Sequence, residues 1–190
     1  MRRPISLAIV ISLLIVGQVI GQHQSAAIGA KIQKSSVASE RAKLGFLAGT
    51  FTTETVIPSS KPSPNGATGK GTSTIAWGLD SMFLLINDES VNPMFGQYKG
   101  HGVLGYDPQE QQFVLSMFNN FGDRPSYKGN FVGDTLVLAT KVPLPGHPFD
   151  QKILWYKDGN AVKMKVFNDM GNGFTPTLEQ TAVPVSQGVK

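Results

Sequence analysis

The sequence contains no cysteine among its 190 residues. Disulfide bonds, thiol redox chemistry and cysteine-ligated zinc or iron are therefore excluded, as is lipid attachment through an N-terminal cysteine. Charged residues are also scarce, at 16% of the chain, whereas hydrophobic residues make up 41%. A chain of this length and composition can bury a stable core without disulfides, and it is long enough for one domain.

Neither sign of charge is in large excess. The chain has 17 basic and 13 acidic residues, and its lysines are scattered rather than clustered. Nucleic-acid-binding proteins and polybasic membrane anchors need a concentrated basic patch. We therefore expect no nucleic-acid partner and no electrostatic attachment to a membrane.

Catalytic motifs are missing as well, since neither H-E-x-x-H nor G-x-S-x-G occurs. Of the three histidines, His23 lies near the N-terminus, whereas His101 and His147 are conceivable ligands of haem or a metal ion. Glu54 and Glu179 fall in the first and last predicted strands, which would be neighbours in a closed barrel. The sequence predicts no catalytic residue, no metal site and no cofactor, with haem left as an alternative.

The N-terminus has the pattern of a secretory signal peptide, which we place at residues 1–21. Arg2 and Arg3 supply positive charge, residues 5–16 are mostly apolar, and residues 19–21 suit cleavage before Gln22. The apolar run is shorter than the roughly 20 residues of a membrane-spanning helix. We expect an exported bacterial protein, periplasmic or secreted, with no stable membrane insertion after cleavage.

The rest of the chain reads as a flexible lead-in over residues 22–37 and a single domain over 38–190. Ser39 suits the N-cap of one short helix, whose apolar face would include Leu44 and Leu47. From Thr50 onward, runs rich in Thr, Val, Ile, Phe and Tyr alternate with Gly, Pro, Asn and Asp, which is typical of strands and turns. We expect strands over residues 50–57, 68–77, 81–89, 98–106, 111–119, 125–131, 134–142, 150–157, 160–168 and 173–182.

Most of the connections are too short for anything but antiparallel neighbours. The sequence therefore predicts an all-β fold, an antiparallel up-and-down barrel of about ten strands with one short N-terminal helix. Two longer, proline-containing connections, over 58–66 and 142–149, would form loops at the barrel rim. Gly100, Gly102 and Gly105 have the spacing of a dinucleotide fingerprint, but a turn and another strand follow. We interpret them as positions where bulky neighbours approach the backbone.

Several segments resemble known families. Residues 47–51, Leu-Ala-Gly-Thr-Phe, resemble the start of calycin (lipocalin-like) barrels, in which a Gly-x-Trp segment plugs one end; Phe51 stands at the Trp position. Residues 98–107 and 129–136 resemble the G-x-G-x-x-G-Y-D stretch and the following hairpin of a bacterial family known only as a domain of unknown function, number 1579. The resemblance covers about residues 40–183 and implies a lipocalin-like barrel, but a fold alone specifies no activity.

Aromatic and methionine side chains are the candidate site residues, because they would line the lumen of such a barrel. The predicted ligand-binding residues are Phe51, Trp77, Phe83, His101, Phe113, Met117, Trp155 and Met164. We expect a binding protein rather than an enzyme, one that holds a small hydrophobic or amphipathic molecule. A lumen too small for any ligand would contradict this expectation. The alternatives are a structural or protein-interaction module of the envelope, in which these side chains would form a filled core, and an enzyme or haem-binding, nitrobindin-like barrel using Glu54 or His101. Oligomeric state stays open.

Overall fold

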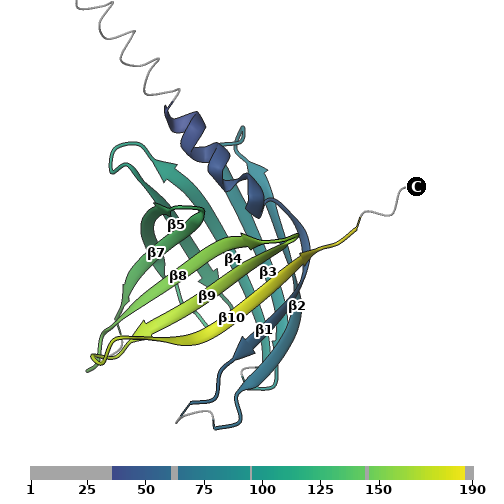
Figure 1. Ribbon diagram of the computed structural model, residues 1–190, viewed down its shortest axis with the longest axis vertical. Coiled ribbons are helices and arrows are strands. Elements are labelled where there is room, and N and C mark those ends of the chain that lie inside the picture. The colour runs from purple at the N-terminus through teal and green to yellow at the C-terminus, as the bar shows by residue number, and fades with distance from the viewer. Residues whose placement is uncertain (1–35, 61–63, 95, 144–145, 187–190) are drawn as a thin grey trace, which may run out of the picture. The chain divides into compact units, whose positions relative to one another are not determined.

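The computed structural model describes residues 36–60, 64–94, 96–143 and 146–186 (Figure 1). The predicted signal peptide, His23 and nearly all of the lead-in lie outside these residues. The chain divides into two compact units, residues 1–40 and 41–190. Among the described residues, no helix has the length and apolar character needed to cross a membrane.

Residues 36–42 are α-helical, and a 3-10 helix, η1 (Lys43–Leu47), follows. Within the first unit, the Ser39 hydroxyl donates a hydrogen bond of 2.8 Å to the Ser36 carbonyl. Ser39 therefore lies inside the helix, and the prediction that it is the N-cap is wrong. Leu44 and Leu47 belong to the second unit and are fully buried in its core, as expected for the apolar face.

The second unit is a closed antiparallel barrel in which each strand pairs with the next and β1 pairs with β10 (Figure 1). The predicted all-β, up-and-down fold of about ten strands is confirmed. The strands are β1 (Gly49–Ile57), β2 (Ala67–Gly78), β3 (Phe83–Asn92), β4 (Gly96–Asp107), β5 (Gln112–Asn119), β6 (Ser126–Val132), β7 (Thr135–Val142), β8 (Phe149–Asp158), β9 (Ala161–Asp169) and β10 (Phe174–Pro184).

Strand β3 begins later than predicted. Leu79, Asp80 and Ser81 have φ values of 50°, 55° and 61°, so the chain is left-handed through the turn after β2. Extended backbone cannot continue through such residues. The turn therefore takes Ser81 and Met82 out of the predicted strand.

One end of the barrel is closed by η1 and by a chain of aromatic rings. Phe131 makes edge contacts with Phe46 of η1 and with Phe113, at centroid distances of 6.4 and 5.3 Å. Phe113 in turn meets Tyr106 at 5.2 Å. Edge-to-face packing of this kind adds to the stability gained from burial alone. We call this end the helix end.

The opposite end carries the β1–β2, β3–β4, β5–β6, β7–β8 and β9–β10 connections, and we call it the loop end. Both predicted rim loops belong to it, although residues 61–63 and 144–145 lie outside the described residues. Several inward-facing side chains near this end are only partly buried, among them Gln151, Val166 and Asn168. Solvent therefore reaches the lumen from the loop end.

The glycines of β4 support the interpretation made from their spacing. A Cβ atom at Gly100 would lie 2.5 Å from the Tyr98 hydroxyl, and one at Gly102 would lie 2.4 Å from the Met117 sulfur. At Gly105 the Phe83 ring would be 2.4 Å away. Bulky side chains thus lie across the β4 backbone where it has no side chain of its own.

Candidate functional site

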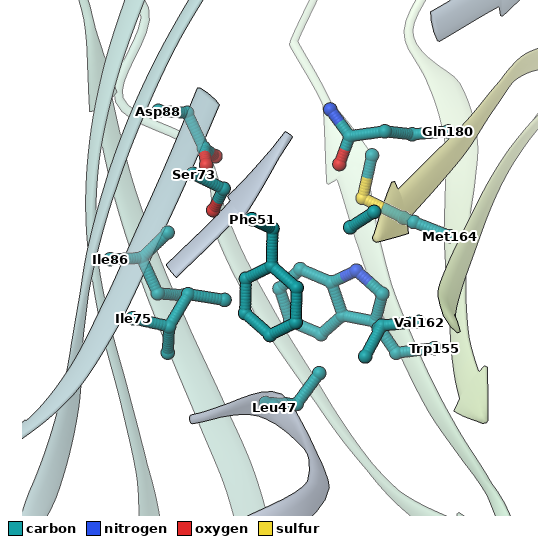
Figure 2. Close-up of a pocket in the computed structure, with 11 residues that line it drawn as sticks. Leu47, Phe51, Ser73, Ile75, Ile86, Asp88, Trp155, Val162, Met164 and Gln180 are labelled. Carbon is teal, nitrogen blue, oxygen red and sulfur yellow. The ribbon is translucent and has the colours of Figure 1, made fainter. Parts of the chain in front are cut away.

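A small cavity lies inside the lumen, where apolar and polar side chains face one another (Figure 2). Its volume is about 20 Å³, enough for about one water molecule. The lining residues are Leu47, Phe51, Ser73, Ile75, Ile86, Asp88, Trp155, Val162, Met164, Gln180 and Ala182.

The part of the lining toward the helix end is apolar, and we call it the aromatic floor. It consists of Phe51 from β1 and Trp155 from β8, with Leu47 of η1 beneath them (Figure 2). All three side chains belong to the buried hydrophobic core. Phe51 is inward-facing because β1 alternates, with Thr50 and Thr52 exposed on either side of it.

The part of the lining toward the loop end is polar, with Ser73 and Asp88 on one wall and Gln180 on the other (Figure 2). Ser73 on β2 and Asp88 on β3 are direct cross-strand partners. Burial raises the pKa of the Asp88 carboxyl, and the hydrogen bond with Ser73 partly opposes that rise. The Gln180 Nε2 donates to the Thr55 hydroxyl at 3.4 Å.

Tyr98 lies next to the polar wall. Its ring folds over Gly100, which is the cross-strand partner of Asp88. Burial raises the pKa of Tyr98 to about 12, and the negative charges of Asp88 and Asp123 contribute to the increase. The phenol therefore stays protonated at neutral pH and is available as a hydrogen-bond donor.

A second polar group lines the lumen nearer the loop end, on strands β6, β8 and β9. The Tyr127 hydroxyl donates to Gln151 Oε1, and Gln151 Nε2 donates to Asn168 Oδ1 at 2.9 Å. Burial raises the pKa of Tyr127 to about 12, with further contributions from Tyr98 and Asp123. These bonds fix the orientation of the Gln151 amide, because its oxygen and its nitrogen each have a partner.

The predicted ligand-binding residues divide into three groups. Phe51, Trp155 and Met164 line the cavity. Phe113 is fully buried, and Trp77 and Met117 pack against the same core.

Phe83 and His101 form the third group, and they lie on the outer face of the barrel. On β3, Leu84 and Ile86 are buried on the lumen side, so the alternation of the strand turns Phe83 outward. On β4 the inward-facing residues include the buried Leu104, and His101 is exposed. The expectation that these two side chains line the lumen is wrong. His101 Nδ1 lies 2.8 Å from Asn87 Oδ1, a neighbour on the same outer face.

The other titratable candidates also lie outside the cavity. His147 is exposed in the β7–β8 connection. Strands β1 and β10 are neighbours, but Glu54 is exposed on the outer face and Glu179 pairs there with Lys165 at 3.2 Å. No group of three or more potential metal ligands occurs in the part of the chain that the structure describes.

A broader groove of about 370 Å³ lies over β3, β4 and β5, lined mainly by outer-face residues and bordered also by the inward-facing Asp88. His101, Lys99 and the 47% exposed Phe118 contribute to it. Asn120 holds its edge in place, since its side chain bonds both the Lys99 amide and the Gln97 carbonyl, at 2.8 and 2.9 Å.

The sequence reasoning missed Ser73, Asp88 and Gln180, which supply the polar wall. A signal for Asp88 was present, because it continues the inward alternation of Leu84 and Ile86. A carboxyl group at an inward position of a strand is unusual enough to mark a candidate site.

Comparison with curated proteins finds no match for this chain. The family model described as "Protein of unknown function (DUF1579)" matches residues 36–179, which is well over half of the chain. The matched range contains η1, β1 to β9 and most of the cavity lining. The chain therefore belongs to the DUF1579 family.

Proposed function

We propose that this protein is a binding protein that holds a small amphipathic molecule in the lumen of its barrel. The observation that carries the proposal is the two-sided lining of the cavity, with the aromatic floor of Phe51 and Trp155 facing the polar groups of Ser73, Asp88 and Gln180. Sites for small molecules typically combine apolar walls with a few polar groups that fix orientation.

The lining favours an amphipathic ligand over a purely hydrophobic one. An apolar molecule would bury Asp88 and Ser73 without new hydrogen bonds, which costs free energy. A ligand with one polar end avoids that cost while its remaining atoms contact apolar surface.

The cavity volume determines where such a ligand would lie. A cavity of about 20 Å³ is too small for a whole ligand and accommodates one small group. Binding therefore requires the rest of the molecule to extend toward the loop end, where inward-facing side chains such as Gln151 are only partly buried. The inward-facing Met164 and Val166 are only partly buried on that side. Methionine adapts readily to irregular shapes, so Met164 can move to admit more of the ligand.

Native mass spectrometry tests the proposal. The full chain would be expressed with its own leader, and the exported protein would be measured before and after denaturation. We expect an added mass that is lost on denaturation. Ala182→Val narrows the cavity and should abolish the added mass, whereas Ala139→Val, on the exposed outer face of β7, should retain it. Equal retention in both variants would place the ligand elsewhere.

The same experiment addresses export, which we propose from the predicted signal peptide. The expected mass of the exported protein corresponds to removal of residues 1–21. Retention of the full mass in the cytoplasm would contradict export. The proposed binding requires no cofactor.

The outer groove supports a second candidate function, that of a protein-interaction module. An exposed phenylalanine beside polar groups that can hydrogen-bond is a common composition for a contact surface. A photo-crosslinker placed at Phe118 would capture a stable partner in intact cells if this function is the correct one. The same crosslinker at the exposed Val132 is the control, since that residue adjoins the β6–β7 connection at the helix end, whereas Phe118 lies near the loop end.

A further inference from the structure

We propose that the polar end of the ligand is a positively charged amine, held between the Asp88 carboxylate and the aromatic floor. This inference rests on the binding proposed above and adds the charge and chemical class of the bound group. Three independent features of the cavity support it.

The first feature is that no described cation faces Asp88 from within the cavity; Lys99 and His101 border only the outer groove, and Lys99 pairs there with Glu89. Glu89 and Glu179 form ion pairs on the outer face, with Lys99 and Lys165 respectively. Asp88 points into the lumen and forms no ion pair with any described residue, and no described residue lining the cavity is cationic. A carboxylate removed from water without a counter-charge is unstable, and a cationic ligand would supply that charge. Burial raises the pKa of Asp88, consistent with an uncompensated site.

The second feature is the number of hydrogen-bond acceptors. An ammonium group carries three donors and no acceptor. The cavity offers the Asp88 carboxylate, the Ser73 hydroxyl oxygen and the Gln180 carbonyl oxygen, which points into the cavity in Figure 2. Gln180 keeps this orientation because its Nε2 donates to Thr55. An anionic group would instead meet the Asp88 charge with no cation to offset it.

The third feature is the floor itself. The faces of tryptophan and phenylalanine attract cations, most strongly when the site is shielded from water. The rings of Phe51 and Trp155 lie on the side of the cavity opposite the polar groups (Figure 2). The volume of about 20 Å³ suits one group of about the size of a water molecule, as an ammonium is.

Three probes that differ only in their polar end test the inference: octylamine, octanol and octanoate, titrated calorimetrically into the full chain near neutral pH. We expect octylamine to bind at least about tenfold more tightly than octanol, with octanoate the weakest. In Asp88→Asn, octylamine should lose about tenfold or more in affinity, while octanol should change by less than about twofold. A tenfold loss corresponds to about 1.4 kcal/mol.

Glu54→Gln is the matched control, because it removes one negative charge from the outer face of β1 and should leave all three affinities unchanged. Binding of octanol or octanoate as tightly as octylamine would overturn the amine inference and leave the proposed binding intact. Binding of none of the three would contradict both. An equal loss of octylamine and octanol in Asp88→Asn would assign Asp88 a structural role and overturn the inference. The order of the three probe affinities for the unaltered protein tests the amine inference even if Asp88→Asn does not fold.

Discussion

Ser73 and Asp88 face each other directly across strands β2 and β3, with both side chains turned into the lumen. The next inward pair toward the helix end, Ile75 and Ile86, is in the same register and is buried. The lining therefore changes from apolar core to polar wall between two successive inward-facing positions on each of these strands. This boundary gives the cavity its two chemically different sides.

Replacing Asp88 with asparagine should stabilise the protein at neutral pH. Burial raises the pKa of this carboxyl above its usual 3.8. An acid with a higher pKa in the folded state binds its proton more tightly when folded, so its contribution to stability is complete below pH 3.8 and is lost as the pH rises through the folded-state value. Asparagine carries no charge and escapes this loss.

Thermal unfolding at a series of pH values measures the effect. A gain of about 1 kcal/mol would raise Tm by about 2–4 °C for a domain of this size. The difference between Asp88→Asn and the unaltered protein should shrink as the medium becomes more acidic. Glu54→Gln, which removes a negative charge from the exposed outer face of β1, is the control; a gain equal to that of Asp88→Asn would show that net charge, not burial, is responsible.

Tyr98 and Tyr127 should ionise only in strongly alkaline solution. Their pKa values are raised to about 12 from the usual 10.0, chiefly by burial. Both phenols hold their protons more tightly in the folded state, so stability should fall as the pH rises from about 10 toward 12. Ultraviolet titration of phenolate absorbance reports this directly.

In Tyr127→Phe, one ionisation near pH 12 should disappear. The variant also loses the hydrogen bond to Gln151, which should lower stability at neutral pH by about 1 kcal/mol. Loss of an ionisation near pH 10 instead would mean that Tyr127 is accessible to solvent.

The barrel could be predicted from the sequence because each strand carries its own signal. Alternation such as Val162, Met164 and Val166, with short turns between strands, is local information and fixes antiparallel pairing. The lumen residues could be predicted only in part. Phe83 and His101 were chosen by residue type, whereas their direction depends on which neighbours are buried. The size of the cavity depends on how side chains from seven different elements pack together, and no local pattern encodes that.

Gly129→Ala should destabilise the barrel. A Cβ atom there would lie 2.0 Å from the Val137 carbonyl oxygen, which belongs to the backbone of β7 and has little freedom to move. Overpacking of this kind typically costs about 1–3 kcal/mol. Gly45→Ala is the matched control, since nothing lies within 4 Å of the added atom. Denaturant unfolding should separate the two; equal stability would mean that β6 and β7 can separate without cost.

Leu47→Ala should reduce stability and enlarge the cavity at once. Leu47 is fully buried, and it forms the base of the cavity beneath Phe51 and Trp155. Truncation of a buried leucine costs about 2–5 kcal/mol, because the space is only partly refilled. An apolar space of that kind can accept a small apolar molecule, so octanol should bind more tightly to the variant than to the unaltered protein.

Leu79→Ala is the control, since Leu79 is 70% exposed in the β2–β3 turn. Loss of stability without any gain in octanol affinity would show that η1 settles into the vacated space, and that the floor of the cavity moves with the helix.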